Sequence, residues 1–404
     1  MTPRPVGIAD FSLLTVLGDD HASQRQALLA GSQAGLVADT HYLRGRLTQL
    51  GRLKTTLPTL PSTLATTFDV RANRLLMRQL DLLSSTIEQQ KSRYPLNRIG
   101  VIMATSTAGL DNLERALPQL DRSGQWPADY HSQHQRMGLV SAFVARYTGV
   151  LGPVMSVATA CSSGNKALAS AKRWLNAGIC DAVICGGVDV LTTMTLRGFD
   201  ALGALSADLP QPFSQNRCGI NIGEAAAVFV LTKTPTAINL LATGESSDAH
   251  HISAPEPQGR GAMAAMQQAL DNAGISSDAI DYINLHGTGT PQNDRMEAAA
   301  IHRVFTDAAS HIPCSSCKPQ IGHTLGVSGL SELGLCLLAM TAEPAQLVLP
   351  AQLALPPHIF DGQYDSEILP LHLVERGQRG RLDTVLSNSF AFGGSNATVI
   401  VGRG

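Results

Sequence analysis

The feature that most constrains the fold of this 404-residue chain is an alternation of strand and helix patterns that occurs twice. In the first half, short apolar runs at residues 98–106, 181–190 and 225–233 read as buried strands. Between them, residues 165–178 have helical apolar spacing, and Gly178 is a candidate helix cap. Strands separated by helices predict an α/β protein with largely parallel sheets covered by helices.

The second half repeats this alternation. Residues 261–275 and 329–342 have helical patterns. Residues 278–290 read as a strand that runs into a Gly/Thr loop, and residues 384–402 read as two strands around a glycine loop. We infer an internal duplication with an N-terminal half at 1–233 and a C-terminal half at 234–404. Residues 20–95 read as cap and connecting material, and the polar stretch 117–135 reads as a loop.

Composition excludes several classes of protein. A net charge of −2 gives no reason to expect nucleic acid or an anionic membrane surface as a partner. No apolar run approaches the roughly 20 residues of a membrane span, and the N-terminus lacks the pattern of a signal peptide. Seven cysteines, an odd number, favour a reducing compartment over a disulfide framework, so we expect a cytoplasmic protein.

The stretch "VATACSSGNKALASAKRW" places Cys161 among small residues, directly before a predicted helix. Free N–H groups and the partial positive charge at a helix N-terminus stabilise a thiolate, so we expect a lowered pKa for Cys161. The same N–H groups can bind an oxyanion. The plain alternative is a buried, inert cysteine, which is the commoner fate of this residue type.

Two histidines stand in glycine-rich loops of the second half. His286 ends an apolar strand and is followed by the hydroxyl side chains of Thr288 and Thr290. Lys318 precedes His323 by five residues. A single histidine is more often a satisfied core or surface group than a catalyst. However, α/β folds place ligands at the carboxyl ends of strands, and the predicted elements bring both histidines to such ends.

Four motifs together resemble a known family. "TACSSG", "HGTGTP", "KPQIGHTLGVSG" and "NSFAFGGSN" are similar, in order and spacing, to the elongating β-ketoacyl-acyl carrier protein synthases, which include polyketide ketosynthases. "RIGVIMATSTAGL" and "QPFSQNRCGINIGEAAAVFVL" extend the resemblance. It implies the thiolase fold, a five-layered α/β/α/β/α arrangement of two duplicated halves, which agrees with the duplication inferred from the patterns.

The resemblance also implies a mechanism, a decarboxylative Claisen condensation. Cys161 is expected to hold an acyl group, while His286 and His323 donate hydrogen bonds to the enolate formed from malonyl-carrier protein. Lys318 is expected to support the histidines and to pair with Glu332. No resident cofactor or metal is implied, because phosphopantetheine arrives on the acyl carrier protein.

Further roles follow from the same resemblance. The N–H groups of Cys161 and Phe392 are expected to bind the oxyanion, and Thr288 and Thr290 to bind the phosphopantetheine arm. The remaining residues expected beside the substrate are Phe199, Ala391 and Gly393. Ala391 stands where glycine is usual, and alanine resists positive φ, so we expect this loop to move less or to follow another path.

The sequence departs from the family elsewhere. "VGIADFSLLTVLG" replaces the usual glycine-rich first strand, so we expect the first strand and its neighbours to differ. Gly203 stands where housekeeping enzymes often carry an arginine for carrier docking. Arg71 and Arg74 are candidates for contacts to the acidic carrier protein, although solvated surface charge is the commoner role of such residues.

Other interpretations remain at this stage. "CSSC" at 314–317 lacks the second ligand pair that a zinc site needs, so no metal is expected. A non-catalytic, chain-length-factor-like subunit would lack Cys161. A thiolase acting on coenzyme A thioesters would carry a second catalytic cysteine, and a starter-unit synthase an asparagine in place of His323. The motifs resemble aryl polyene or type II polyketide ketosynthases, which implies a homodimer or a heterodimer with a chain-length-factor-like homologue.

Overall fold

The two halves of the chain form sheets with the same connectivity. The computed structural model describes residues 4–341 and 352–404. The strands of the first half are β1 (Val6–Leu14), β4 (Ile99–Ala104), β5 (Val154–Val157), β6 (Ala182–Asp189) and β8 (Ala225–Thr232). Those of the second are β9 (Ile238–Ser247), β10 (Tyr282–Asn284), β11 (Pro313–Ser315), β15 (Thr384–Ala391) and β16 (Ser395–Arg403). Numbered by succession within its half, each set lies in the order 3-2-4-5-1.

One short antiparallel contact joins the two sets. Val6 and Gly7 of β1 pair with Leu240 and Asn239 of β9, which gives an eleven-stranded sheet with β13 (His372–Leu373) at its far edge. In each of the two five-strand sets, the second strand, β4 or β10, pairs in parallel with both of its neighbours. The other two pairs of each set are antiparallel. The prediction of largely parallel sheets was therefore wrong. In the second half, β15 and β16 connect through a short turn, which forces an antiparallel pair. In the first half, a longer segment that contains α8 (Thr193–Ala201) joins β6 to β8, and these strands also pair antiparallel.

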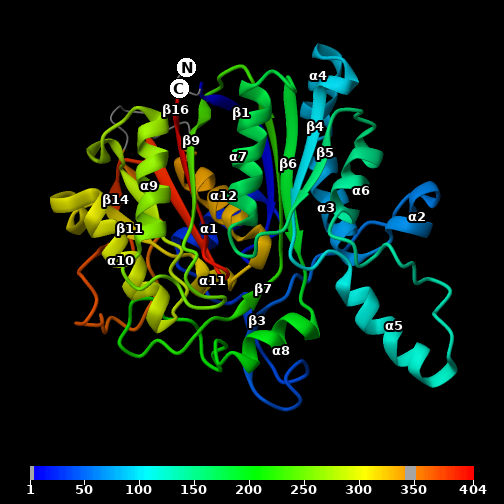
Figure 1. Ribbon diagram of the computed structural model, residues 1–404, viewed down its shortest axis with the longest axis horizontal. Coiled ribbons are helices and arrows are strands. Elements are labelled where there is room, and N and C mark those ends of the chain that lie inside the picture. The colour runs from blue at the N-terminus through cyan, green and yellow to red at the C-terminus, as the bar shows by residue number, and fades with distance from the viewer. Residues whose placement is uncertain (1–3, 342–351) are drawn as a thin grey trace.

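Helices form three layers around these strands. The helices of the layers are α3 (Arg71–Leu82) with α6 (Leu139–Thr148), α7 (Ser163–Asn176) with α12 (Ser328–Met340), and α9 (Arg260–Ala273) with α10 (Pro291–Phe305). Figure 1 shows α9, then α12 and α7, then α3 and α6 in succession across the molecule, with strands between them. Helices α7 and α12 pack against strands of both halves. This five-layer order confirms the predicted fold class.

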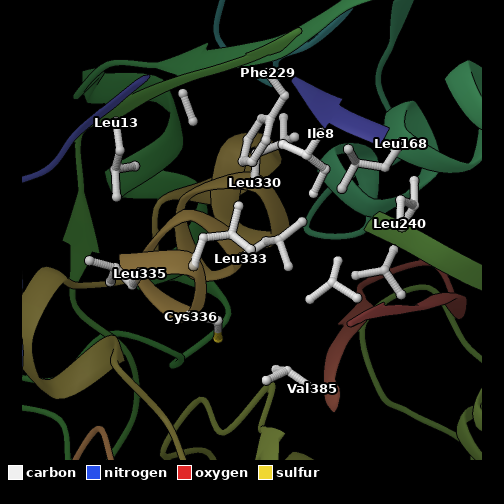
Figure 2. Packing of buried hydrophobic residues seen from close by; sticks show 14 of the residues in the cluster. Ile8, Leu13, Leu168, Phe229, Leu240, Leu330, Leu333, Leu335, Cys336 and Val385 are labelled. Carbon is white, nitrogen blue, oxygen red and sulfur yellow. The ribbon is translucent and has the colours of Figure 1, made fainter. Parts of the chain in front are cut away.

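The central helix α12 explains why the two halves stay together. All thirteen of its residues are buried, as expected for a helix in which apolar residues predominate. Leu330 and Leu333 lie among Phe229 of β8 and Val385 of β15, side chains from opposite halves (Figure 2). Burial of one such leucine contributes about 2 kcal/mol, so α12 stabilises the pairing of the halves.

Several segments differ from the expectations. The first strand, β1, is regular and central, with one bulge between Ile8 and Asp10, so the unusual first motif does not change its place in the fold. Helix α3, within the supposed connecting residues 20–95, buries seven residues against the sheet. Helix α5 (Leu110–Ser123) extends through Pro118 into the predicted loop at 117–135 and projects from the body (Figure 1).

The other predicted elements are present within a few residues of their expected bounds, and Gly178 adopts the left-handed conformation that ends α7. Residue 342, the last of one predicted helix, lies outside the described residues. The smaller elements are α1 (His21–Leu29), α2 (Ser62–Phe68), α4 (Ser84–Arg93), α8 (Thr193–Ala201), α11 (Lys318–Ile321), β2 (Leu36–Asp39), β3 (Thr48–Gly51), β7 (Ile222–Gly223), β12 (Leu353–Ala354) and β14 (Arg379–Gly380). Across residues 4–341 and 352–404, no helix has the length and apolar character that crossing a bilayer requires.

Candidate active site

Cys161 sits on a strained turn between β5 and α7. Ala160, directly before it, has a φ of 53°, a left-handed conformation that is uncommon for a residue with a Cβ. The turn is held by Ser163, whose N–H and hydroxyl both donate to the carbonyl oxygen of Ala160. Backbone strain of this kind persists only where the surroundings fix it, and here it presents the Cys161 side chain ahead of the helix.

Two backbone N–H groups and a second loop complete the surroundings of the thiol. The backbone N–H groups of Phe392 and of Cys161 itself lie close enough to the sulfur to act toward lowering the pKa of the thiol. Ser162 donates to Ser395 Oγ at 2.9 Å, which ties the turn to the loop between β15 and β16. The structure thus brings the two N–H groups predicted for an oxyanion hole to the same side chain.

His286 and His323 face this thiol. The Nε2 atom of His323 lies 3.0 Å from Cys161 Sγ. The two imidazole rings lie at 85° to each other with centroids 5.6 Å apart. One side-chain atom from each of the three residues lies within 4.8 Å of the others, and all three residues are buried. Segments 125 and 162 residues away from Cys161 therefore meet at one point, as the motifs predicted.

Lys318 supports the histidines from behind. Its ammonium group lies 2.5 Å from Glu332 Oε1, with both side chains 1% exposed, so the expected pair is present. The ammonium also donates to the backbone oxygen of His286 at 2.5 Å. Glu332 accepts a further hydrogen bond from Ser328 Oγ, which satisfies a charge that would otherwise be costly to bury.

Hydrogen bonds at the far side of each ring determine its tautomer. The N–H of Leu325 donates to His323 Nδ1 at 3.1 Å, and Lys318 Nζ lies 3.4 Å from His286 Nδ1. Both partners can only donate, so Nδ1 must be the acceptor in each ring and the proton of a neutral ring must lie on Nε2. Leu325 itself has a φ of 55°, so strained backbone aims this donor too.

Burial keeps both rings neutral. It lowers the pKa of His286 well below its ordinary value, and the nearby charge of Lys318 acts in the same direction. The pKa of His323 is lowered well below the ordinary value for the same two reasons. At neutral pH, each histidine is therefore a hydrogen-bond donor through Nε2–H.

The expected lowered pKa of Cys161 was wrong. Burial raises the pKa of this thiol to about 11, although Lys318 and the Phe392 N–H act to lower it. Desolvation of the anion outweighs the helix N-terminus because the Cys161 side chain is buried at the inner end of a cavity. The resting residue is therefore a thiol, and the anion forms only when a reaction partner compensates its charge.

The tautomers also bear on metal binding. Three atoms of Cys161, His286 and His323 are close enough to ligate one ion. A ligating histidine offers a lone pair at one nitrogen and donates its other N–H to an acceptor. Here the far nitrogens face donors instead, and the Lys318 ammonium stands beside them. The cluster does not fit a metal.

Two buried carboxylates position the His286 loop, and the sequence analysis missed both. Glu297 of α10 accepts hydrogen bonds from the N–H groups of His286 and Gly287 at 2.7 and 2.8 Å. Asp294, one turn earlier, accepts from Gly289 N at 3.2 Å. The spacing of these acids in "NDRMEA", soon after "HGTGTP", is the signal that could have identified them.

A cavity of about 310 Å³ leads from the surface to the thiol. Thr288 and Thr290 line it, with their hydroxyl oxygens 2.9 Å apart. Phe199 and Phe392 also line it, and their ring centroids lie 5.6 Å apart. These residues are where the motifs predicted substrate contact.

Ala391 and Gly393 differ in position. Ala391 lines the cavity but ends β15, paired with Ser395 and outside the left-handed region, so the alanine causes no strain. The positive φ angles of the turn fall on Gly393 and Gly394 instead. Gly393 is not among the cavity-lining residues, and its substrate contact stays a prediction.

The carrier-docking candidates do not reach this cavity. Arg71 forms a two-pronged ion pair with the buried carboxylate of Glu224, and Arg74 pairs with Asp69. Both arginines line a separate groove. Gly203 does line the cavity, where its lack of a side chain leaves the rim without the usual arginine.

Comparison with known families decides the assignment. The model of the β-ketoacyl synthase N-terminal domain matches residues 68–237, and that of the C-terminal domain matches residues 238–352. The chain belongs to the β-ketoacyl synthase family. The 3-oxoacyl-[acyl-carrier-protein] synthase 2 of Coxiella burnetii is 32% identical over 339 residues, which cover 79% of this chain and 78% of that protein. The Staphylococcus aureus protein of the same name is 32% identical and covers 80% and 77%.

Solved β-ketoacyl synthases have the same fold. A chain from the complex of the ketosynthase ApeO with its chain length factor ApeC, from Xenorhabdus doucetiae, aligns with a TM-score of 0.91 and 40% identity, covering 99% of this chain and 98% of that chain. The ishigamide ketosynthase/chain length factor aligns with a TM-score of 0.84 and 26% identity, covering 100% of both chains. As a β-ketoacyl synthase, the protein is a condensing acyltransferase.

Proposed function

We propose that the protein is an elongating ketosynthase that condenses an acyl group held on Cys161 with malonyl-acyl carrier protein, giving 3-oxoacyl-acyl carrier protein. The observation that carries this proposal is the position of Cys161 Sγ 3.0 Å from His323 Nε2, with a second neutral histidine beside it. One side chain supplies the nucleophile, and two supply hydrogen-bond donors for developing negative charge.

In the first half-reaction, Cys161 sulfur attacks the acyl thioester carbonyl. The N–H groups of Cys161 and Phe392 face that sulfur and stabilise the tetrahedral oxyanion. The C–S bond to phosphopantetheine then breaks, and the proton of the Cys161 thiol ends on the released pantetheine thiol. His323 does not act as a base here, because its Nε2 carries a proton.

In the second half-reaction, the malonyl thioester carbonyl takes the place between the two Nε2–H groups. Loss of CO2 leaves an enolate, whose oxygen accepts both hydrogen bonds. Its carbon attacks the acyl-Cys161 carbonyl, the bond to sulfur breaks, and the Cys161 thiolate takes a proton from solvent. Two donors of this kind contribute several kcal/mol to the transition state, at about 3 kcal/mol for each.

The cavity suits delivery of substrate on a long arm. Thr288 and Thr290 offer paired hydroxyl groups to the amides of phosphopantetheine, and the Phe199–Phe392 pair lines the same cavity as the thiol. The protein needs no resident cofactor, since the arm brings the thioester. The acyl carrier protein is accordingly its first partner.

A second partner covers one edge of the sheet. Among the described residues, strand β5 pairs only with β4, and Leu151 and Val154 beside this edge are 70% and 45% exposed. An open edge with apolar side chains favours pairing with another chain. We assign this place to a chain-length-factor-like homologue, in line with the resemblance to the complex of ApeO with ApeC.

The same similarities support our proposal for the pathway. Chains from ketosynthase and chain length factor complexes match essentially the whole sequence. We therefore place the enzyme in an aryl polyene or type II polyketide pathway rather than in housekeeping fatty-acid synthesis. All seven cysteines are free thiols, and six of them are buried, which fits the reducing cytoplasm.

Intact-protein mass spectrometry tests the proposal directly. The protein, co-expressed with its chain-length-factor-like homologue, is mixed with a panel of acyl-carrier proteins. We expect an added acyl mass on Cys161, and 3-oxoacyl product once malonyl-carrier protein is added. Acylation at another residue, or acyl transfer only from coenzyme A, would contradict the proposal.

A further inference from the structure

His358 is a third buried histidine, outside the cavity. It lies in the segment after β12, is 5% exposed, and does not line the cavity that ends at Cys161. Phe213 and Phe360 hold its ring, with centroids 5.8 and 5.2 Å away in edge-on arrangements. A buried imidazole needs partners for both ring nitrogens, and those partners show what this side chain does.

Both nitrogens bind backbone groups of other segments. The N–H of Ser316 donates to His358 Nδ1 at 3.2 Å, and His358 Nε2 lies 3.0 Å from the carbonyl oxygen of Pro212. The carbonyl can only accept, so the neutral ring carries its proton on Nε2 and accepts at Nδ1. Burial lowers the pKa of His358 to about 4, which keeps this arrangement intact at neutral pH.

Each of these contacts continues to a catalytic loop. Ser316 Oγ donates to the backbone oxygen of Gly287 at 2.8 Å and accepts from the N–H of Lys318 at 3.3 Å. Through Ser316, His358 therefore reaches both the His286 loop and the turn that begins with Lys318.

On the other side, the contact runs through the segment at Pro212. The N–H of Phe213 donates to Asp294 Oδ2 at 2.8 Å, and Asp294 Oδ1 accepts from Gly289 N at 3.2 Å. The hydrogen bonds thus form a closed ring around the His286 loop, and His358 is the link that joins the Ser316 turn to the Pro212 segment.

We propose that His358 is a positioning residue, which fixes the turn carrying Lys318 relative to His286 and so supports the decarboxylation half-reaction. This inference rests on the proposed function. The oxyanion hole formed by Cys161 and Phe392 belongs to other segments and has no direct bond to His358. Loss of His358 should therefore affect the two half-reactions unequally.

Two substitutions separate the positioning role from simple packing. His358→Leu keeps the volume but removes both hydrogen bonds, while His358→Gln retains an acceptor and a donor. His302→Leu is the matched control, because His302 also bonds a carbonyl oxygen, that of Pro370, but lies on the exposed side of α10. If His358→Leu does not fold, His358→Asn replaces it, because its shorter side chain has no atom at the position of Nε2 and so breaks the link to Pro212.

Two readouts test the inference, and the first compares the rates of the two half-reactions. Malonyl decarboxylation should fall about tenfold or more in His358→Leu, while acylation of Cys161 changes less than about threefold. His358→Gln should recover most of the loss, and His302→Leu should match the wild type. An equal fall in both half-reactions, or no recovery with Gln, would overturn the proposal.

The second readout, hydrogen–deuterium exchange, does not depend on the proposed function. Hydrogen–deuterium exchange of residues 311–321 should be about tenfold faster in His358→Leu than in the wild type, because the turn loses a buried anchor. It should be unchanged in His358→Gln. If the wild-type protein neither acylates nor decarboxylates, the proposed function fails, but this exchange measurement still decides whether His358 holds the turn. Unchanged exchange in His358→Leu would reject it.

Discussion

Helices α7 and α12 hold equivalent places in the two halves, and the turns before them differ in one informative residue. Ala160 and Leu325 both have positive φ, and each lies three residues before its helix begins. The next residue is Cys161 in the first half and Gly326 in the second. A Cβ at Gly326 would lie 2.7 Å from Ser106 Oγ and 2.9 Å from Asp189 Oδ2, so no side chain fits there.

The difference shows how a duplicated fold supports two kinds of chemistry. The first turn presents a thiol to a cavity. The second turn presents only backbone N–H groups, of which that of Leu325 sets the tautomer of His323 and that of Val327 binds Asp189. One strained turn therefore supplies the nucleophile, and its counterpart orients a hydrogen-bond donor.

The largest expected effect separates the two turns. In Cys161→Gln, condensation should fall by at least about 10³-fold, because no acyl-enzyme forms. Malonyl decarboxylation should persist, since both histidines remain. Product analysis and CO2 release measure the two activities, with thermal unfolding as the check on folding. Normal condensation in this variant would remove Cys161 from the mechanism.

The pH dependence of alkylation tests whether the first turn holds a thiol at rest. Only the thiolate reacts with iodoacetamide, and the pKa of Cys161 is raised to about 11. The thiolate fraction, and with it the rate, should therefore rise about tenfold per pH unit between about pH 7 and 10. Cys161→Ala corrects for other thiols. A rate that levels off near neutral pH would show a preformed thiolate instead.

A smaller effect is expected from Lys318→Met. His286 would lose its Nδ1 partner and Glu332 would be buried without a counter-charge, so decarboxylation should fall about 10²-fold. Stability should fall by about 3 kcal/mol or more, measured by chemical unfolding. The double variant Lys318→Met/Glu332→Met should regain stability but not activity. Recovery of both would make the pair purely structural.

The smallest effect concerns the loop of the second half. Burial raises the pKa of Glu297 to about 7, so the carboxylate that accepts two N–H groups is fully formed only above that pH. Decarboxylation should rise as pH increases through about 7. Glu297→Gln should lower the kcat of decarboxylation about tenfold and abolish its rise with pH near 7, because an amide accepts at only one atom. If the rate still rises with pH in the variant, the titration of another group causes it.

The sequence was most informative where chemistry is local. Cys161, His286, His323 and Lys318 each stand in a motif, and the structure brings all four together. The pKa of Cys161 could not be predicted, because it depends on enclosure by segments more than a hundred residues away. The role of His358 and the ion pair of Arg71 were missed for the same reason: their partners, Pro212 and Glu224, are distant in the chain.

In the fold, too, local features were predictable from the sequence and features that depend on distant contacts were not. Long apolar runs such as the one that became β8 were predicted within one or two residues. The antiparallel pairs and the helix through Pro118 were not, because sheet direction and tolerance of a proline depend on tertiary packing.

The central claim is that the rings of His286 and His323 are both neutral and carry their proton on Nε2. Nitrogen NMR of the protein with ¹⁵N-labelled histidine, assigned with His286→Ala and His323→Ala variants, measures it directly. Between about pH 6 and 8, we predict that both rings are neutral, with protonated Nε2 and unprotonated Nδ1, since their pKa values lie well below the ordinary one. A proton on Nδ1 of either ring, or an imidazolium in this range, would contradict it.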